Sequence, residues 1–418
     1  MTQEEDSRII RIVHPICCGL DVHKESVSAC VVFPDTETGE ERYELQVFGT
    51  FTDELMRLRE WLLMHECPVV AMESTGIYWR PVHNVLEDLF QVVLVNARDV
   101  RNVPGRKTDM GDSRWLAGLL RHGLLRGSFI PPMEVRQWRD LTRLRKQYVH
   151  TVGDYKKRVH KLFESANIKI DSVVSDLFGA TGQNLMNLLI DERNLTLEDV
   201  HACVRGKLKG KEEELFRSIR GFFTDHHRFV LKTILLTISH LETQIETLDQ
   251  QIRSSMKEHE ALLNRMKEAA GISNVSARDI LAEIGPTLES FPTAPALASW
   301  AGLCPGNNES AGKRKSGRSH VRKHHLKTIM IEAAWAAIKK KGSYFKDKYY
   351  RLKARRGAKK AIVAIAHRIL LGIYHVIKEG VPFRDLGEEY LSRRNASLKL
   401  LHLRKQARSL GFDLVAIA

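Results

Sequence analysis

Residues 1–130 carry the apolar patterns of β-strands, with helical spacing between the later ones. Apolar runs at 16–22 and 26–33, joined by a tight connection, and an alternating stretch at 42–51 predict three sequential strands. The pattern then predicts a helix at 51–65, a strand at 68–72, a helix at 79–90, a strand at 92–95 and a helix at 109–121. Three sequential strands followed by βαβ units predict a mixed α/β sheet.

Two long, charged helices are predicted in the middle of the chain. One extends from Val135 to about Ala166 and the other from about His227 to Ala270, each with apolar residues at roughly heptad spacing. This spacing predicts an antiparallel pair or a dimerising coiled coil, and a helical bundle without a partner accounts for it equally well. Residues 167–226 are predicted to form an irregular helical insert between the two helices.

The last part of the chain is predicted to be helical around one loop rich in glycine and proline. Residues 271–285, GISNVSARDILAEIG, have the pattern of a helix-hairpin-helix unit, whose turn presents backbone N–H groups to phosphates. The other predicted elements are a short helix at 294–301, a loop at 301–319 and amphipathic helices at 324–340 and 359–378.

Aromatic side chains alternate with cations between those two amphipathic helices. The mixture suits phosphate contact combined with base stacking, and packing of the helix ends is the plain structural alternative. The aromatic residues are Tyr344, Phe345, Tyr349 and Tyr350.

Length and pattern together predict more than one domain, because 418 residues exceed what one small core organises. The fold class is therefore α/β plus α. We expect a sheet domain at 1–130, a long-helix region with its insert at 131–268, a C-terminal domain at 269–385 and a tail at 386–418. The tail sequence indicates no chemistry.

Charge is distributed unevenly along the chain, whose net charge is +14. Residues 313–360 hold 18 Lys and Arg against 2 Asp and Glu, whereas residues 1–130 hold 14 against 20. A basic segment of this density indicates phosphate contacts, although solvated helix faces are the usual explanation of scattered charge. The cations expected to bind nucleic acid are Lys313, Arg314, Lys315, Arg318, Arg322, Lys323 and Lys327.

The composition predicts a cytoplasmic protein with no membrane partner. No stretch approaches the roughly 18 uncharged apolar residues that span a membrane. Residues 1–10 are acidic and lack the shape of a signal peptide. The six cysteines are scattered without a CxxC pair, which is typical of buried thiols in a reducing compartment.

Four acidic residues stand where a sheet can bring them together. Asp21 ends the first strand, Glu73 ends the fourth, and Asp109 and Asp112 are three residues apart on the helix after the last strand, so they share a face. Each alone suits a solvated or capping acid. Together they match an RNase H-like arrangement, in which converging carboxylates need cations to remain ionised. Two Mg²⁺ ions about 3.5–4 Å apart can then polarise a phosphodiester.

The loop at 301–319, AGLCPGNNESAGKRKSGRS, holds three serines among cations: Ser310, Ser316 and Ser319. A serine surrounded by cations can attack a phosphodiester and hold the resulting phosphate. A flexible basic loop that only contacts a nucleic-acid backbone explains the same residues.

Four blocks in this order resemble the DEDD transposases of the insertion-sequence one-ten family, to which the Piv-like DNA invertases belong. The blocks are GLDVHK, ESTGIYW, the KTDxxD helix, and the serine loop followed by EAAWAA. The resemblance extends from about Cys18 to about residue 390. The family's loop commonly closes with a basic-Gly-Asn turn, which this chain replaces with SHVRKHHLK.

The resemblance implies a RuvC-like first domain with Asp21, Glu73, Asp109 and Asp112 as a catalytic, metal-binding tetrad. It implies that Ser310 is the nucleophile of a recombinase that cuts and rejoins DNA through a phosphoserine. Several family members are guided by a structured RNA from the element, and members work as dimers that pair into tetramers. The serine domain of one subunit then completes the carboxylate site of another.

The expected partners are therefore the element ends and target DNA, a guide RNA and further copies of the chain, in the nucleoid. Two other functions fit many of the same residues. One is a RuvC-like nuclease that uses water, with Ser310 contacting phosphate only, and the other is a non-catalytic nucleic-acid-binding protein. The carboxylates suit both catalytic functions, so only the serine loop separates those two.

Overall fold

Two units make up the chain, Met1–Ile130 and Pro131–Ala418. The computed structural model describes residues 11–35, 37–74, 76–96, 111–191, 194–305, 308–310, 313–316 and 324–414. Within 308–316 the description covers the backbone only.

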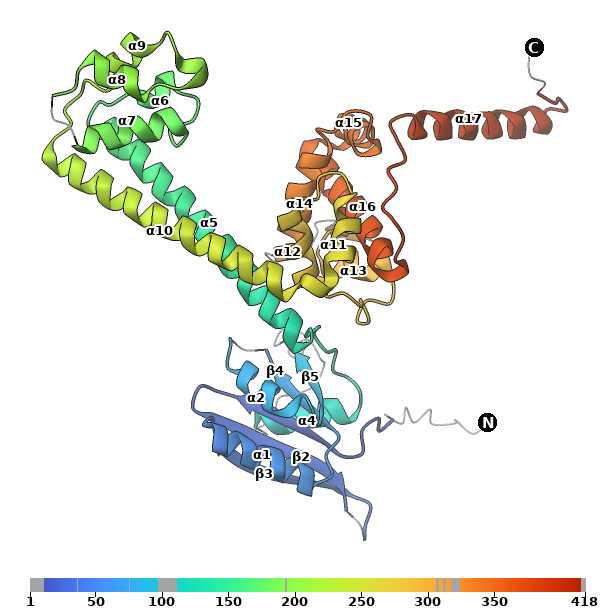
Figure 1. The fold of residues 1–418 in the computed structure, drawn as a ribbon. Helices are drawn as coiled ribbons and strands as arrows, with labels where there is room; N and C mark the ends of the chain where they lie inside the picture. The colour runs from blue at the N-terminus through green and yellow to red at the C-terminus, as the bar shows by residue number, and fades with distance from the viewer. Residues whose placement is uncertain are drawn as a thin grey trace. The chain divides into compact units, whose positions relative to one another are not determined.

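The first unit is built on a five-stranded mixed sheet of order β3-β2-β1-β4-β5 (Figure 1). Its strands are β1 (Cys17–Val22), β2 (Ser26–Pro34), β3 (Glu41–Gly49), β4 (Val69–Glu73) and β5 (Gln91–Val95). β2 pairs antiparallel with both β1 and β3, whereas β4 pairs in parallel with β1 and β5. The predicted mixed sheet is confirmed, and it is consistent with an RNase H-like domain.

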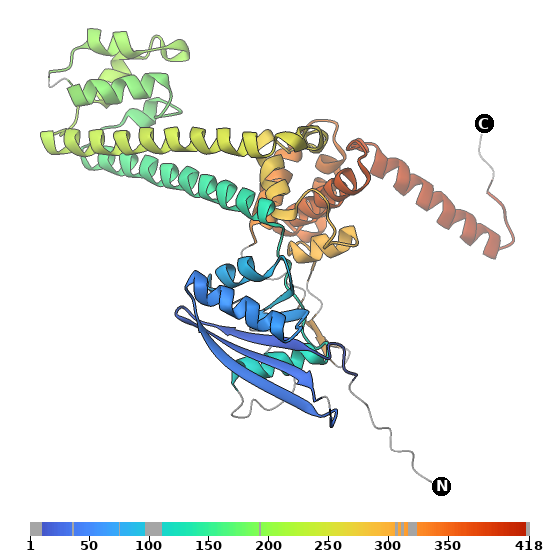
Figure 2. The ribbon, with the colours of Figure 1, turned by 60° about the horizontal axis from the view of Figure 1, so that its bottom comes forward.

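Helices cover both faces of this sheet (Figure 2). They are α1 (Thr52–Met64), α2 (Trp79–Leu86) and α4 (Asp112–Arg121). α1 and α2 share an apolar core with one face, in which Leu20 and Met72 are fully buried. On the other face, Ala117 and Leu120 of α4 form a separate cluster with Cys17 of β1. Adjacent residues of β1 therefore face different helices, as the two-residue period of a strand requires.

The second unit begins with two long helices that lie side by side, α5 (Met133–Ser165) and α10 (Asp225–Ser255) (Figure 1). Their ion pairs show that the helices are antiparallel: Arg145 pairs with Asp249, and Lys156 pairs with Glu242. This agrees with the pairing expected from the apolar spacing.

The predicted second helix is interrupted at its C-terminal end. α10 ends at Ser255, and a single 3₁₀ turn, η2 (Lys257–His259), precedes α11 (Glu260–Lys267). No glycine or proline marks the break in the sequence. Tertiary packing explains it: Met256 is fully buried, and the ring of His259 lies 5.2 Å from that of Trp138 in α5.

A small helical insert with its own core separates α5 from α10. Its elements are α6 (Ile170–Val173), α7 (Ala180–Asp191), α8 (Leu197–Cys203), η1 (Gly206–Leu208) and α9 (Glu212–Ser218). Phe163 of α5 and Leu231 of α10 are buried in the same cluster as Leu185 and Leu215 of the insert. The insert therefore packs on the joined ends of the two long helices.

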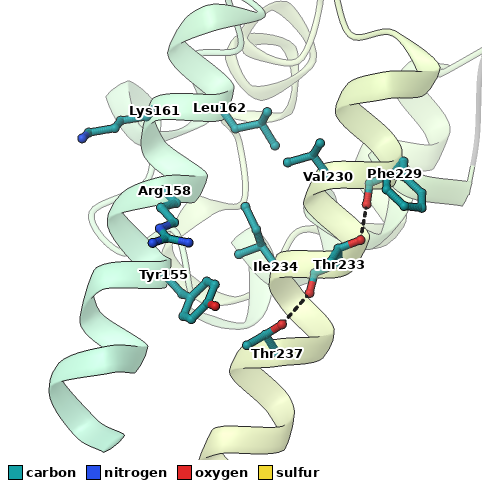
Figure 3. Close-up of a pocket in the computed structure, with 9 residues that line it drawn as sticks. All are labelled: Tyr155, Arg158, Lys161, Leu162, Phe229, Val230, Thr233, Ile234 and Thr237. Atoms are coloured by element: carbon teal, nitrogen blue, oxygen red, sulfur yellow. Dashed lines mark hydrogen bonds between the residues drawn. The ribbon is translucent and has the colours of Figure 1, made fainter. Parts of the chain in front are cut away.

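An open hollow of about 530 Å³ lies between α5 and α10 beside this core (Figure 3). Its apolar lining includes Leu162 and Ile234. The hydroxyls of Thr233 and Thr237 donate to carbonyl oxygens of their own helix, at 2.8 and 2.9 Å. The hydrogen bonds of these hydroxyls are therefore satisfied within their own helix, and the hollow is mainly apolar.

The remaining elements of the second unit follow α11. They are α12 (Asn274–Ile284), α13 (Ala294–Trp300), β6 (Asn308–Ser310), β7 (Lys313–Ser316), α14 (His325–Ala337), α15 (Tyr344–Arg356), α16 (Ala358–Glu379) and α17 (Tyr390–Ser409). α12 matches the helix predicted in the helix-hairpin-helix segment: Ser273 caps its start, and Gly285 ends it with a φ of 77°.

α16 is the central helix of this region. It packs on α11, α13, α14 and α15. By length and composition alone it could cross a membrane, but half of its apolar stretch is buried in the protein, which is typical of a core helix.

Burial also decides the role of the aromatic residues near α16. Tyr344, Phe345 and Tyr349 are buried, and only Tyr350 is exposed, so three of the four serve packing.

Candidate active site

Asp21 and Glu73 lie side by side at the ends of adjacent parallel strands. The pairing of β1 with β4 sets Leu20 beside Met72, so the next residues along the two strands are Asp21 and Glu73. Ala71, two residues before Glu73, belongs to the cluster beneath α4. Alternate residues of a strand share a face, and register neighbours in a parallel sheet do so as well. Both carboxylates therefore lie on the face that α4 covers.

Gly19 allows α4 to approach β1 closely. A Cβ atom at this position would lie 2.1 Å from the carbonyl oxygen of Ser113 and 2.5 Å from the amide nitrogen of Ala117, both in α4. Distances this short exclude every side chain, so the glycine determines a backbone-to-backbone contact. Asp112 directly precedes Ser113, and Asp21 follows Gly19 by two residues. The contact therefore places the first turn of α4 next to β1, the strand that carries Asp21.

In the described residues α4 begins at Asp112, and its N-cap is Gly111, with an extended ψ of 150°. The helix face that Asp109 and Asp112 were expected to share stays a prediction. Asp112 occupies the first turn, where a carboxylate interacts favourably with the helix dipole. Asp109 lies outside the described residues. Three of the four predicted acids thus fall on described elements.

Among the residues that the structure describes, no three His, Cys, Asp or Glu side chains form a group that could hold a metal ion. The donor chemistry nevertheless suits one. Asp21 and Glu73 present carboxylate oxygens on one face, and hard divalent cations such as Mg²⁺ take oxygen ligands. A third carboxylate, that of Asp112, stands in the first turn of α4.

His23 is a partner of Asp21 that the sequence analysis did not assign. Its Nε2 lies 3.1 Å from Oδ2 of Asp21, and its side chain is 65% exposed. The backbone N–H of His23 donates to the backbone carbonyl of Ser26, at 2.9 Å, and this hydrogen bond closes the β1–β2 turn. The sequence did hold a sign of this pairing, because His23 follows Asp21 by two residues, and residues two apart at the end of a strand share a face.

Ser310 is the last residue of a short antiparallel hairpin. β6 and β7 pair Ser310 with Lys313 and Glu309 with Arg314. The prediction of a loop without regular structure is therefore wrong here. Three- and four-residue strands are too short for a periodic pattern, and the many glycines and prolines around them suggested a loop.

The predicted nucleic-acid-binding cations lie in and after this hairpin. Lys313, Arg314 and Lys315 belong to β7, and Lys327 belongs to the first turn of α14. The others, Arg318, Arg322 and Lys323, lie outside the described residues, as does Ser319.

The two ends of the segment that carries the hairpin are held together by a ring contact. The ring of Trp300, at the end of α13, lies 4.3 Å from that of His324, which precedes α14. Burial lowers the pKa of His324 to about 4. The imidazole is therefore neutral near pH 7, as suits its contact with an aromatic ring.

A buried ion pair joins α12 to α5 in the same region. Both oxygens of Glu283 accept hydrogen bonds from the guanidinium of Arg143, each at 2.9 Å, and the Glu283 side chain is only 3% exposed. Arg139 lies 3.7 Å from the same carboxylate. Near it, burial raises the pKa of Asp279 to about 6, although Arg145 counteracts this. The sequence signal was one charged residue within an apolar stretch, LAEIG.

The comparisons with known proteins agree with this architecture. Residues 18–168 match a model of the DEDD transposases of the IS110 type, described as transposase. Residues 263–350 match the model described as "Transposase IS116/IS110/IS902 family". No curated protein matches the chain.

The protein is thus a transposase, an enzyme that cleaves DNA strands and transfers them. It belongs to the IS110 family of DEDD transposases, as the resemblance of its sequence blocks had indicated. DNA is accordingly its partner.

Proposed function

We propose that this transposase cuts and rejoins DNA through a phosphoserine intermediate. In this proposal Ser310 is the nucleophile, and Asp21, Glu73, Asp109 and Asp112 bind two Mg²⁺ ions. One observation carries the metal half of the proposal: Asp21 and Glu73 are register neighbours on the face covered by α4, in a chain of a DEDD family. The serine half rests on the position of Ser310 in a hairpin whose second strand carries three consecutive cations.

The chemistry is an exchange of one phosphodiester for another. Oγ of Ser310 loses its proton and bonds to phosphorus, while the bond from phosphorus to a deoxyribose oxygen breaks and that oxygen takes up a proton. Rejoining reverses this step, with the hydroxyl of another strand as the attacking group. The number of phosphoester bonds is unchanged, so no external energy source is required. Bound Mg²⁺ would polarise the phosphate and stabilise the attacking and leaving oxygens.

The cations around Ser310 have a role in the same step. Lys313, Arg314 and Lys315 follow the serine within one hairpin, and Lys327 lies in the next helix. Positive groups beside a phosphate that gains charge stabilise the transition state more than the ground state. Arg318, Arg322 and Lys323 extend this series in the sequence.

We further propose that a structured guide RNA binds the chain and that the active species is a dimer that pairs into tetramers. The excess of cations in residues 313–360 suits a second polyanion besides DNA. The long helices carry exposed apolar side chains that suit contact with another copy: Leu144 is 38% exposed, Val149 43% and Leu236 63%.

A denaturing gel tests the nucleophile. The full-length protein is mixed with labelled element-end DNA, Mg²⁺ and the RNA of the element, and a covalent adduct is expected as a band of reduced mobility. Ser310→Ala should abolish this band, whereas Ser316→Ala and Ser319→Ala are matched controls in the same segment and should retain it.

The same gel separates the alternatives. DNA cleavage that survives Ser310→Ala without any adduct would favour a nuclease that uses water. Asp21→Asn should abolish both adduct and cleavage. If Asp21→Asn left recombination intact, the metal half of the proposal would fail.

A further inference from the structure

Cations of three helices converge around Lys348 of α15. Four guanidinium groups act on its ammonium: Arg351 and Arg355 of α15, Arg368 of α16 and Arg394 of α17. Burial, followed by the repulsion of these charges, lowers the pKa of Lys348. Two of the arginines, Arg368 and Arg394, also act on the buried Tyr344 of α15. The convergence therefore involves all three helices.

Direct contacts hold the start of α17 on α15. Nη2 of Arg351 donates to Oγ of Ser392, at 2.7 Å, and Nε of the same guanidinium donates to the carboxylate of Asp347, at 2.8 and 3.0 Å. The rings of Tyr344 and Tyr390 meet edge to face, with centroids 5.8 Å apart. Arg394, one turn beyond Tyr390, is thus brought to α15 by specific packing of α17.

The converging cations exceed the negative charge around them. Asp347 is paired with Arg351, and Glu389, in the turn before α17, is paired with Arg393. Two further carboxylates lie near: Asp385 accepts from the backbone N–H groups of Tyr344 and Gly387, and Glu388 lines the same hollow as Arg394, so the cations still outnumber the acids. Lys348, Arg355, Arg368 and Arg394 form no ion pair within the described part of the chain; we call these four residues the tail cluster. Arg355, Arg368 and Arg394 are exposed to solvent. Like charges held together by packing repel one another, and an anion at this place removes that cost.

We propose that the tail cluster is a binding site for the phosphate backbone of nucleic acid, which α17 completes by contributing Arg394. Guanidinium groups match phosphate oxygens in geometry, and exposed cations on neighbouring helices contact a backbone without selecting its sequence. The site is formed by residues outside the carboxylate and serine segments. It rests on the proposed function only in taking nucleic acid as the ligand, and it gives a role to a tail whose sequence indicated none.

The test measures binding of the full-length double variant Arg368→Gln/Arg394→Gln in EDTA at 0.15 M salt. The two probes are a random-sequence DNA duplex and a random-sequence RNA hairpin. Two lost contacts should weaken duplex binding about 30-fold and reduce the slope of log K against log salt by about 1.8. Arg404→Gln/Lys405→Gln removes the same charge from an exposed later part of α17 and should weaken binding by less than about 5-fold.

Further measurements separate charge from folding and identify the ligand. Arg368→Lys/Arg394→Lys keeps the charge and should restore most of the affinity, and thermal melting of each variant checks that the fold is intact. A loss confined to one probe identifies DNA or RNA as the ligand. Affinity within 2-fold of the wild type on both probes, or an equal loss in the control variant, would overturn the proposal. EDTA removes the divalent cations that the proposed cleavage needs, so this assay measures binding alone. Failure of the phosphoserine chemistry would therefore not affect this result.

Discussion

Replacement of Gly19 by alanine tests the contact that places α4 on the strand of Asp21. The added Cβ would meet backbone atoms of α4 at 2.1 and 2.5 Å and Cβ of Leu116 at 2.9 Å. Backbone atoms in a helix cannot rotate away as the end of a side chain can. The whole of α4 must therefore move outward, and Asp112 must move with it.

The magnitude follows from the cost of overpacking. Extra atoms in a packed core typically cost about 1–3 kcal/mol, and the backbone clash puts Gly19→Ala at the upper end, about 3 kcal/mol. For a unit of this size, each kcal/mol lowers Tm by about 3–4 °C. We therefore expect Tm of the first unit to fall by about 10 °C. DNA cleavage, which depends on Mg²⁺ in the proposed mechanism, should fall as well, since Asp112 leaves its position relative to Asp21.

The assay is thermal unfolding of the full-length protein, with strand cleavage measured well below Tm. Gly118→Ala is a matched control in α4 itself, because a Cβ there meets nothing within 4 Å. Replacing a glycine inside a helix should stabilise the protein by about 0.5–1 kcal/mol. If Gly19→Ala melted and cleaved like the wild type, α4 would not depend on this contact and the reasoning would be refuted.

Three further substitutions, the last compared with a fourth at an exposed tyrosine, test the second unit. Glu283→Gln leaves the guanidinium of Arg143 without its charge partner and should lower the free energy of unfolding by about 3 kcal/mol in urea titrations. His324→Gln should flatten the pH dependence of stability, because burial lowers the pKa of His324 from 6.5 to about 4, so the wild type loses stability as the pH falls through that window. Tyr349→Ala should cost about 3–4 kcal/mol, because the ring is only 4% exposed, whereas Tyr350→Ala, at 54% exposure, should cost less than about 1 kcal/mol.

Each of these has a control or a contradicting outcome. Lys157→Gln breaks an ion pair whose side chains are 74% and 68% exposed, so it should change stability by less than about 0.5 kcal/mol. An equal effect of Lys157→Gln and Glu283→Gln would show that burial of the pair is irrelevant. An unchanged pH profile in His324→Gln would contradict the assigned pKa. Weaker nucleic-acid binding at full stability in Tyr349→Ala would favour stacking over packing.

Much of the first unit could be predicted from sequence because its signals are local. The apolar runs that end in Asp21 and Glu73 identify two strands with acids at their ends, and three sequential strands before a βαβ unit indicate a mixed sheet. The strand order and the face covered by α4 depend on contacts distant in the chain. Gly19 was therefore inconspicuous, although a glycine inside a strand is a known mark of close backbone approach.

The second unit shows where local signals fail. The apolar pattern continues through Met256, yet the helix breaks there because of packing against α5. The hairpin of Ser310 has strands too short to produce a period. The pairing of Glu283 with Arg143 joins residues 140 apart in the sequence, so only the charged residue in an apolar stretch could be noticed beforehand.

The most direct test of the account is to identify the residue that becomes attached to DNA. Trypsin cleaves after lysine and arginine, so Ser310 falls in peptide 279–313, Ser316 in 316–318 and Ser319 in 319–322. After nuclease digestion of the adduct, mass spectrometry should find a nucleotide phosphate on peptide 279–313, with fragmentation placing it on Ser310. A nucleotide on either of the other two peptides, or efficient strand transfer without any modified serine, would contradict the account.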